Sequence, residues 1–242
     1  MDVIRLFTRW VFIVLIPVLL LSATIAWAFN SLWIYKAGFA KYDVGQTLGL
    51  SPAELDRSAS ELIAYFNNPH QEFLDINVTY NTGVTAPLYD QADILHMKDV
   101  KGVIWLDYGL LLSAVIYSLV YILVSIVWNK RNGRRELALG ATWGGGLTVA
   151  LLCLLGIFVV TSFDSFFITF HEIFFPQGNW QFPFGDHMIT LFPDGFWSNV
   201  TMLVGLVALV LAIIIWCVGF VLLRSNKRGL ALIQPESGDK KV

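Results

Sequence analysis

The sequence predicts an all-α membrane protein: a four-transmembrane-helix bundle with an extracellular cap of short helices and a small β-hairpin. Hydrophobic residues make up 56% of the 242 residues and charged residues only 14%, whereas roughly a quarter of the residues of a soluble domain are charged. Four apolar stretches each exceed the approximately 20 residues that a helix needs to cross the hydrocarbon core. Basic residues are concentrated in three of the segments that flank these stretches, which orients them.

The basic residues predict which segments face the cytoplasm. Arg5 and Arg9 precede the first span, Lys130 and Arg135 lie between the second and third spans, and Lys240 lies in the tail. Because such residues resist translocation, both termini are expected in the cytoplasm. The first apolar run is longer than the core of a signal peptide, so we expect an uncleaved anchor. The predicted segments are a cytoplasmic N-terminus (1–9), transmembrane helix 1 (10–34), an extracellular cap segment (35–105), transmembrane helix 2 (106–128), a cytoplasmic basic turn (129–136), transmembrane helix 3 (137–162), an extracellular aromatic segment (163–197), transmembrane helix 4 (198–223) and a cytoplasmic tail (224–242).

The first outer segment carries signals of local structure. Ser51, Pro52 and Glu54 supply an N-cap, a first-turn proline and a reciprocal capping glutamate, which predict an amphipathic helix of about four turns. Residues 73–80 alternate as a strand, and the Asn-Thr-Gly sequence that follows them predicts a turn into a second strand over 84–88. We therefore expect a small hairpin beside the helix.

Two further patterns concern helix packing and the membrane surface. Gly140 and Gly144 form a small-xxx-small pair in the third span, which allows close approach of another helix. The segment 163–197 is rich in phenylalanine and tryptophan, which is typical of an aromatic belt at the level of the lipid headgroups. The belt accounts for most of these aromatic residues, but it does not account for the polar residues among them.

Two histidines are expected at the same height above the membrane. The run 90–101 leads directly into the second span as a helix, and a tight turn makes spans two and three an antiparallel hairpin. His96 and His171 lie at similar distances along the chain from that turn. If both helices are continuous, a rise of 1.5 Å per residue places the two imidazoles level to within about one helical turn. The helices must tilt, bend or fold down if either ring is to meet lipid.

Imidazole suits proton transfer near neutral pH because its ordinary pKa is about 6.5. Burial of His171 among Phe167, Phe170 and Phe174 is expected to favour its neutral form, which a general base requires. Carboxylates at helical spacing are candidates to orient the rings. These candidates are Asp93 and Asp99 on either side of His96, and Asp164 before His171.

Other interpretations of these residues remain open. An interfacial histidine is often only a polar anchor, and His187 could line the same site or merely cap a helix. No metal ligands are predicted, because the His-Glu-x-x-His pattern of a zinc site is absent. There is no Gly-x-Ser-x-Gly elbow and no basic aromatic patch, so neither a serine hydrolase nor a nucleic-acid partner is favoured.

Three outer blocks of sequence resemble the bacterial lipoprotein intramolecular transacylase family. They are Pro-Leu-Tyr (87–89) followed by His-Met-Lys-Asp-Val-Lys (96–101), then Phe-His-Glu-Ile-Phe-Phe-Pro (170–176) with Trp180, and finally Leu-Phe-Pro (191–193) with Phe-Trp (196–197). The resemblance implies an enzyme of the bacterial cell membrane that needs no cofactor. Such an enzyme moves the sn-2 acyl chain of a diacylglyceryl lipoprotein to the α-amino group of its N-terminal cysteine, giving a lyso-form lipoprotein.

The resemblance also implies that His96 and His171 are the catalytic pair. One would remove a proton from the attacking amine, and the other would stabilise the oxyanion or protonate the glyceryl oxygen; the roles could be reversed. The expected partners are diacylglyceryl lipoproteins and membrane lipid. The residues expected to contact the substrate are Tyr89, Phe167, Phe170, Phe174, Trp180 and His187.

Two alternatives belong to other functional classes. The first is a non-enzymatic four-span receptor or adaptor that binds lipid or peptide on its outer face and uses the histidines for packing or pH sensing. The second is a membrane hydrolase or metalloprotein that uses His96, His171, His187 and Glu172. Replacement of the histidines by glutamine distinguishes the first from a transacylase, and metal analysis distinguishes the second.

Overall fold

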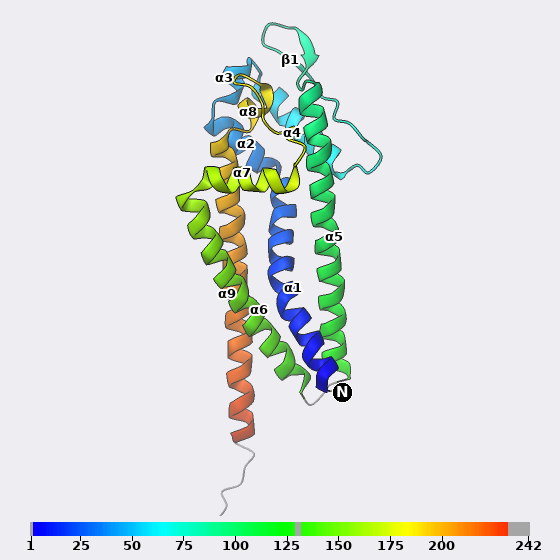
Figure 1. The fold of residues 1–242 in the computed structure, drawn as a ribbon, viewed down its shortest axis with the longest axis vertical. Coiled ribbons are helices and arrows are strands. Elements are labelled where there is room, and N and C mark those ends of the chain that lie inside the picture. The colour runs from blue at the N-terminus through cyan, green and yellow to red at the C-terminus, as the bar shows by residue number, and fades with distance from the viewer. Residues whose placement is uncertain (1, 129–131, 232–242) are drawn as a thin grey trace, which may run out of the picture. The chain divides into compact units, whose positions relative to one another are not determined.

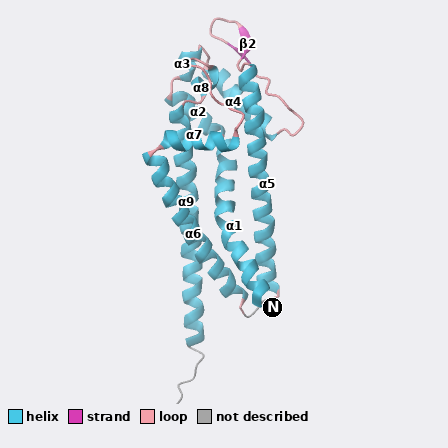
Figure 2. Cartoon of the chain, viewed as in Figure 1, coloured by secondary structure: helices cyan, strands magenta, loops and turns pink. Residues whose placement is uncertain are grey.

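The computed structural model describes residues 2–128 and 132–231. Helices form nearly all of the ordered structure, and strands are confined to one short pair (Figure 2). The described residues contain four helices that are long and apolar enough to cross a membrane. These four are α1 (Asp2–Phe29), α5 (Gln91–Val127), α6 (Gly133–Thr161) and α9 (Asp194–Ala231).

The chain divides into two compact units, and each long helix contributes to both. Unit 1 consists of Met1–Leu20, Leu111–Cys153 and Ala208–Val242, and unit 2 consists of Leu21–Leu110 and Leu154–Val207. Unit 1 therefore contains one end of each long helix. Unit 2 contains the other ends together with all the short elements between them.

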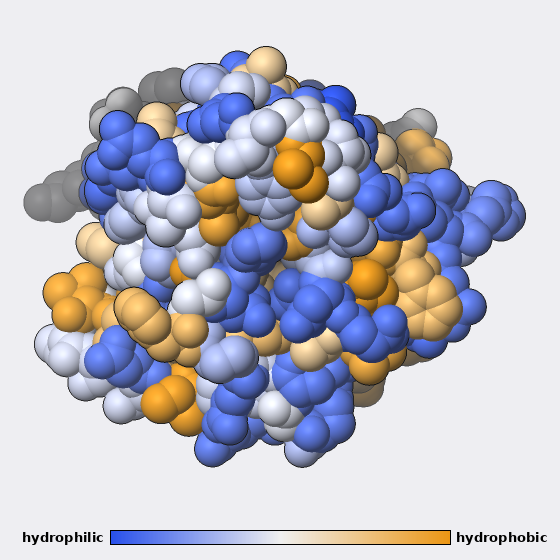
Figure 3. All heavy atoms as spheres, turned by 90° about the horizontal axis from the view of Figure 1, so that it is seen from above, coloured by the Kyte–Doolittle hydropathy of each residue, from blue (hydrophilic) through white to orange (hydrophobic). Residues whose placement is uncertain are grey.

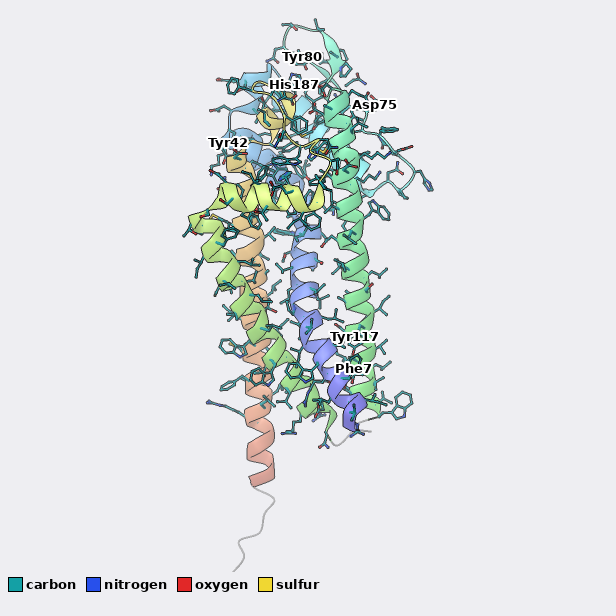
Figure 4. All side chains as sticks on the ribbon, viewed as in Figure 1. Phe7, Tyr42, Asp75, Tyr80, Tyr117 and His187 are labelled. Atoms are coloured by element: carbon teal, nitrogen blue, oxygen red, sulfur yellow. The ribbon has the colours of Figure 1, made fainter. Side chains whose placement is uncertain are left out.

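Unit 1 is held together by a small apolar core around α1. Phe12 stacks on Tyr121 with ring centroids 4.5 Å apart, and Ile16 is buried in the same cluster. A Cβ atom added to Gly140 would lie 2.6 Å from the Phe12 ring, and one added to Gly144 would lie 2.4 Å from Ile16. The small-residue pair thus permits the close helix approach that the sequence predicts. Figure 4 labels Tyr117, also of unit 1, whose hydroxyl donates to the Thr8 carbonyl.

Unit 2 gathers the short helices around one end of α5 (Figure 1). Its core contains fully buried side chains from several of them, among them Val44, Leu62, Tyr65 and Leu191. The elements that form this cap are α2 (Leu32–Lys41), α3 (Val44–Leu48), α4 (Pro52–Asn67), β1 (Asn77–Thr79), β2 (Thr85–Pro87) and α8 (His187–Leu191). The cap predicted from the sequence is therefore a packed structure with a core of its own.

The capped helix forms where the sequence predicts it, and the hairpin forms within the predicted segments but is shorter, pairing only 77–79 with 85–87 and not the whole of 73–80 and 84–88. The Ser51 hydroxyl accepts from the Glu54 amide at 3.2 Å and starts α4. Strands β1 and β2 pair antiparallel with Val78 opposite Ala86, and Gly83 takes the left-handed conformation that the turn requires. The expected return contact of the glutamate is wrong, because its carboxylate accepts from the Thr79 amide at 2.9 Å and pairs with Arg57.

One expected helix is interrupted, and a separate helix follows the third span. The helix expected over 10–34 stops at Phe29, and α2 begins at Leu32 after a turn at Asn30 and Ser31. The third long helix ends at Thr161, and α7 (Phe163–Phe174) follows as a separate helix. In Figure 1, α7 lies across the direction of the unit-2 part of α5. The residues predicted to form the basic turn and tail fall partly outside the described ranges; Lys130, Arg131, Lys240 and Lys241 are among them.

Candidate active site

The two histidines predicted to act together lie side by side in unit 2. His96 is on α5 and His171 is on α7, and their ring centroids are 6.2 Å apart with the planes inclined by 21°. Both side chains are buried. The height comparison from the sequence holds for helices that continue to both histidines, and it requires a tilt, bend or fold for either ring to meet lipid; the chain breaks before His171. The break at Ser162 starts a new helix, α7, which carries His171 and crosses the direction of α5 (Figure 1).

Aromatic side chains enclose the histidine pair. The Phe175 ring centroid lies 4.9 Å from that of His96 and 5.5 Å from that of His171. The Phe182 ring lies edge-on to His96, and the ring centroids of Trp180 and His171 are 4.8 Å apart. Such surroundings exclude water from the imidazoles and strengthen electrostatic interactions among the groups that remain.

One nitrogen of His171 is fixed by the backbone of its own helix. Its Nδ1 lies 2.8 Å from the Phe167 carbonyl oxygen, and because a carbonyl can only accept, Nδ1 is assigned the proton. The neutral ring therefore carries its lone pair on Nε2. Burial lowers the pKa of His171 below its ordinary value, although the Phe167 carbonyl and the charge of Asp194 oppose that shift. A neutral imidazole with a free Nε2 is the form a general base needs.

A polar network reaches His96 from the segment after α7. The Asp99 Oδ2 atom accepts hydrogen bonds from the side-chain amides of Gln177 and Asn179, each at 2.7 Å. The Asn179 side chain in turn interacts with His96. Asn179 Oδ1 and His96 Nδ1 are both buried, and neither has a partner that meets full hydrogen-bond geometry within the described residues. A proton on Nδ1 directed at Oδ1 satisfies both atoms after a small side-chain adjustment.

A cavity of about 370 Å³ opens beside the two rings. This volume is within the range of small-molecule sites. His96, His171 and Asp164 contribute polar atoms to its lining. The remaining wall is largely apolar and aromatic, and includes Phe29, Leu62, Phe66, Phe192 and Trp197. The cavity thus combines two proton-transfer groups with a surface that suits a hydrocarbon chain.

Two of the three carboxylates expected to orient the imidazoles do something else. Asp164 lines the cavity, but Phe167 occupies the hydrogen-bonding position on His171 Nδ1. Asp164 lies seven residues before His171, about 10 Å along the helix axis, which is too far for direct contact. Asp93 accepts from the Asp90 amide at the start of α5 instead of binding His96. Only Asp99 acts on its expected partner, through Asn179.

The residues expected to contact substrate divide into two groups. Phe167 and Trp180 line the cavity, whereas Phe170 packs edge-on against His171 and Phe174 stacks on Phe170. Tyr89 is buried in the core of the cap, and burial raises the pKa of its hydroxyl.

His187 lies elsewhere in the cap, labelled in Figure 4, where its Nδ1 donates to the Leu88 carbonyl at 2.7 Å. It borders a separate depression that contains neither His96 nor His171. His187 begins helix α8, so the alternative of a structural role at a helix start describes it better than a place beside the catalytic pair.

Several residues of the site were not predicted from the sequence. Asn179, Gln177, Phe175, Phe182 and Asp194 all act on the histidines or on the network behind them. The Gln-Gly-Asn run at 177–179, with two amide side chains around a glycine next to an aromatic block, is the signal that points to the network. Nothing local connects that run with Asp99.

Comparisons with known proteins match this chain to a family model and to a curated relative. The family model described as "Lipoprotein intramolecular transacylase Lit" matches residues 10–197. An uncharacterized protein of Aquifex aeolicus is 26% identical over 131 residues, covering 54% of this chain and 56% of that protein. The matched stretch therefore spans little more than half of that relative.

Solved structures share the fold. The membrane-integral lipoprotein intramolecular transacylase Lit from Bacillus cereus is similar, with a TM-score of 0.76 and 17% identity, over 94% of this chain and all of that one. A histidine-to-alanine variant of the same protein gives a TM-score of 0.70, also at 17% identity, over 94% of this chain and 97% of that one. Because these identities are low, the structures show a common multi-pass membrane fold. The family match covers most of the chain, and the chain belongs to the lipoprotein intramolecular transacylase family.

Proposed function

We propose that this chain transfers the sn-2 acyl chain of a diacylglyceryl lipoprotein to the α-amino group of the lipoprotein's N-terminal cysteine. The observation that carries the proposal is the pair of buried imidazoles, 6.2 Å apart, beside a largely apolar cavity. Family membership supports the same activity. The substrate is then a lipoprotein held at the outer surface of a bacterial cell membrane, with both termini of the enzyme in the cytoplasm and the cap outside.

The reaction is an isomerisation of its substrate. The cysteine nitrogen attacks the ester carbonyl, a carbon–nitrogen bond forms, and the bond between the carbonyl carbon and the glyceryl oxygen breaks. One proton moves from the nitrogen to the glyceryl oxygen, so no water is consumed and no external acyl donor is needed. Because nucleophile and ester are on one molecule, the enzyme has only to hold them together and move that proton.

The geometry favours His171 as the base. Its Nδ1 proton is held by the Phe167 carbonyl, and Nε2 is left to accept the proton of the attacking amine. His96, whose Nδ1 proton is directed at Asn179, has a free Nε2, so it can take the amine's proton over from His171 and deliver it to the glyceryl oxygen. While it carries that proton it also stabilises the oxyanion, in a position set by Asp99 and Asn179. Two imidazoles at this separation repel each other when both are charged. One proton at a time therefore suits the pair.

The apolar part of the cavity wall is the proposed binding surface for the acyl chain. Phe29, Leu62 and Phe66 present an apolar surface on one part of the lining, and Phe192 and Trp197 continue it. Burial of a fatty chain against such a surface contributes about 0.8 kcal/mol per methylene. This binding energy is available to hold the ester against the imidazoles.

The test uses the purified full-length protein and a synthetic diacylglyceryl lipopeptide in detergent micelles. Mass spectrometry with fragmentation reads whether the acyl chain has moved to nitrogen. The intact protein is expected to give the lyso-form peptide, and His171→Ala and His96→Ala are each expected to lower the rate about 10²- to 10⁴-fold. Because both residues act on the same proton, the double variant is expected to lose little more than either single variant.

His70→Ala is the matched control, because His70 lies in an exposed loop of the same unit. An active double variant would contradict the proposal. So would a His171→Gln variant of full activity, which is the outcome that a receptor or adaptor predicts.

A further inference from the structure

Three carboxylates meet in unit 2 at a place that the proposed reaction does not use. Asp90, Asp93 and Asp186 each offer an oxygen within 4.8 Å of the others. Two come from the start of α5 and one from the residue before α8, so residues far apart in the chain converge. No salt bridge to this cluster is found among residues 3–128 and 132–225, whose side chains the structure describes.

Helix capping uses one oxygen of each carboxylate. Asp90 Oδ1 accepts from the amides of Ala92 and Asp93, and Asp93 Oδ2 accepts from the Asp90 amide at 3.0 Å. Asp186 Oδ1 accepts from the Met188 amide at 2.7 Å. These bonds account for the presence of the three residues, but they leave a second oxygen on each side chain.

The second oxygen of Asp93 is the independent observation that points to a ligand. Asp93 is only 1% exposed, and its Oδ1 atom is buried with no hydrogen-bond partner among the described residues. The side chain lies close enough to the Asp186 carboxylate for the two groups to interact directly. A carboxylate removed from water beside two others is strongly unfavourable unless a positive charge or a proton joins them.

We propose that Asp90, Asp93 and Asp186 bind a calcium ion. An all-oxygen ligand set suits a hard divalent cation. Ligands of one Ca²⁺ lie about 2.4 Å from it, so two of them are at most about 4.8 Å apart, whereas the limit for Mg²⁺ is about 4.2 Å. The three oxygens lie within 4.8 Å of one another, so one Ca²⁺ can reach all of them. Ca²⁺ also accepts irregular coordination, whereas Mg²⁺ requires a near-ideal octahedron.

The cluster is open to solvent on one side. Asp90 is exposed and Asp186 is half-buried, so an ion can enter through Asp90 and keep water ligands there. Figure 3, which views the molecule from the capped end, shows hydrophilic residues gathered over much of that face.

Calcium at this place ties together two elements that carry the catalytic site. Asp93 is one turn before His96 on α5, and Asp186 precedes Met188, which lines the cavity. The ion therefore holds the start of α5 against the start of α8. Binding itself does not depend on the proposed reaction, but the consequence for activity does.

The test measures binding and stability without any lipoprotein substrate. Purified full-length protein is stripped with EDTA and titrated with CaCl₂ at neutral pH, and thermal unfolding is followed by tryptophan fluorescence. We expect a saturable rise in Tm of roughly 5 to 10 °C at about one hundred times Kd. Sodium chloride at equal ionic strength is expected to give no such rise.

Asp186→Asn is expected to abolish the rise in Tm. If Asp186→Asn does not fold, Asp90→Asn, at an exposed position, takes its place in the test. Asp75→Asn is the matched control: Asp75 is an exposed acid of the same unit, labelled in Figure 4, and its Oδ1 accepts from the side-chain amide of its neighbour Asn77. It should keep the full response.

A flat titration up to about 10 mM Ca²⁺, beyond the range of weak extracellular sites, would overturn the proposal and indicate a shared proton. An undiminished rise in Asp186→Asn would overturn it too. An equal response to Mg²⁺ at the same concentrations would overturn the assignment to calcium. Because no substrate is present, none of these outcomes depends on transacylation.

Discussion

Replacement of Asp99 by leucine tests whether the network behind His96 sets the catalytic rate. Leucine fills a similar volume but cannot accept the two amide hydrogen bonds from Gln177 and Asn179. Those bonds hold the segment between α7 and Trp180 against α5. Their loss frees Asn179 next to His96 and Trp180 next to His171, without removing either imidazole.

The magnitude follows from the two bonds. A hydrogen bond to a charged acceptor contributes about 1.5 to 3 kcal/mol, and Asp99 is half-buried, so water replaces part of what is lost. A net loss of about 1.4 to 2.7 kcal/mol in transition-state stabilisation corresponds to a rate about 10- to 100-fold lower. Since Asp99 does not line the cavity, we expect the loss in kcat and little change in KM.

The assay is the lipopeptide conversion followed by mass spectrometry, at several substrate concentrations. Glu72→Gln is the matched control, because Glu72 pairs with Lys98, the neighbour of Asp99, at 2.6 Å but on an exposed surface. Such a pair contributes little, and activity should be unchanged. Full activity of Asp99→Leu, or an equal loss in Glu72→Gln, would refute the positioning role.

Two further predictions concern pH and packing. Burial lowers the pKa of His171 below its ordinary value, so the base is mostly neutral at pH 6.5 and the rate should fall only at lower pH. Trp180→Ala exposes the ring and should move the acidic side of the pH–rate profile to higher pH. A profile that does not move would count against His171 as the base. The same shift means that the unfolded chain binds the extra proton first, so stability should fall as the pH drops below 6.5. Gly144→Ala places a Cβ atom 2.4 Å from Ile16 and should lower the free energy of unfolding by about 1 to 3 kcal/mol. Gly146→Ala on the same helix has its nearest contact at 3.7 Å and should leave that free energy unchanged. Thermal unfolding in detergent compares the two variants, and equal Tm values would show that the contact at Gly144 relaxes.

Signals that are local in sequence predicted their structures well. The N-cap at Ser51 and the Asn-Thr-Gly turn gave a helix and a hairpin at the expected places, because capping and turn conformations depend on neighbouring residues. Four apolar stretches likewise predicted four long helices, since length and composition decide whether a helix can span.

The site was only partly predictable because its geometry is not local. The third span was predicted to end at 162, but no proline or glycine there indicates that the aromatic segment starts with a separate helix, so α7 was not predicted, although the meeting of His96 and His171 was. The contact of Asp99 with Asn179 spans 80 residues, and helical spacing offered the wrong partner for Asp164. Short-range periodicity identifies which residues share a face but not which loop folds over that face.

The ring of Phe175 has a consequence for the fate of the acyl group. Its ring lies beside both imidazoles and is only 2% exposed, so it fills space next to the two bases that water would otherwise occupy. An activated ester in a wet site is lost to hydrolysis, whereas in a dry one the tethered amine is the sole competitor. A hydrocarbon ring in this position favours transfer over hydrolysis by occupying volume, without any chemistry of its own.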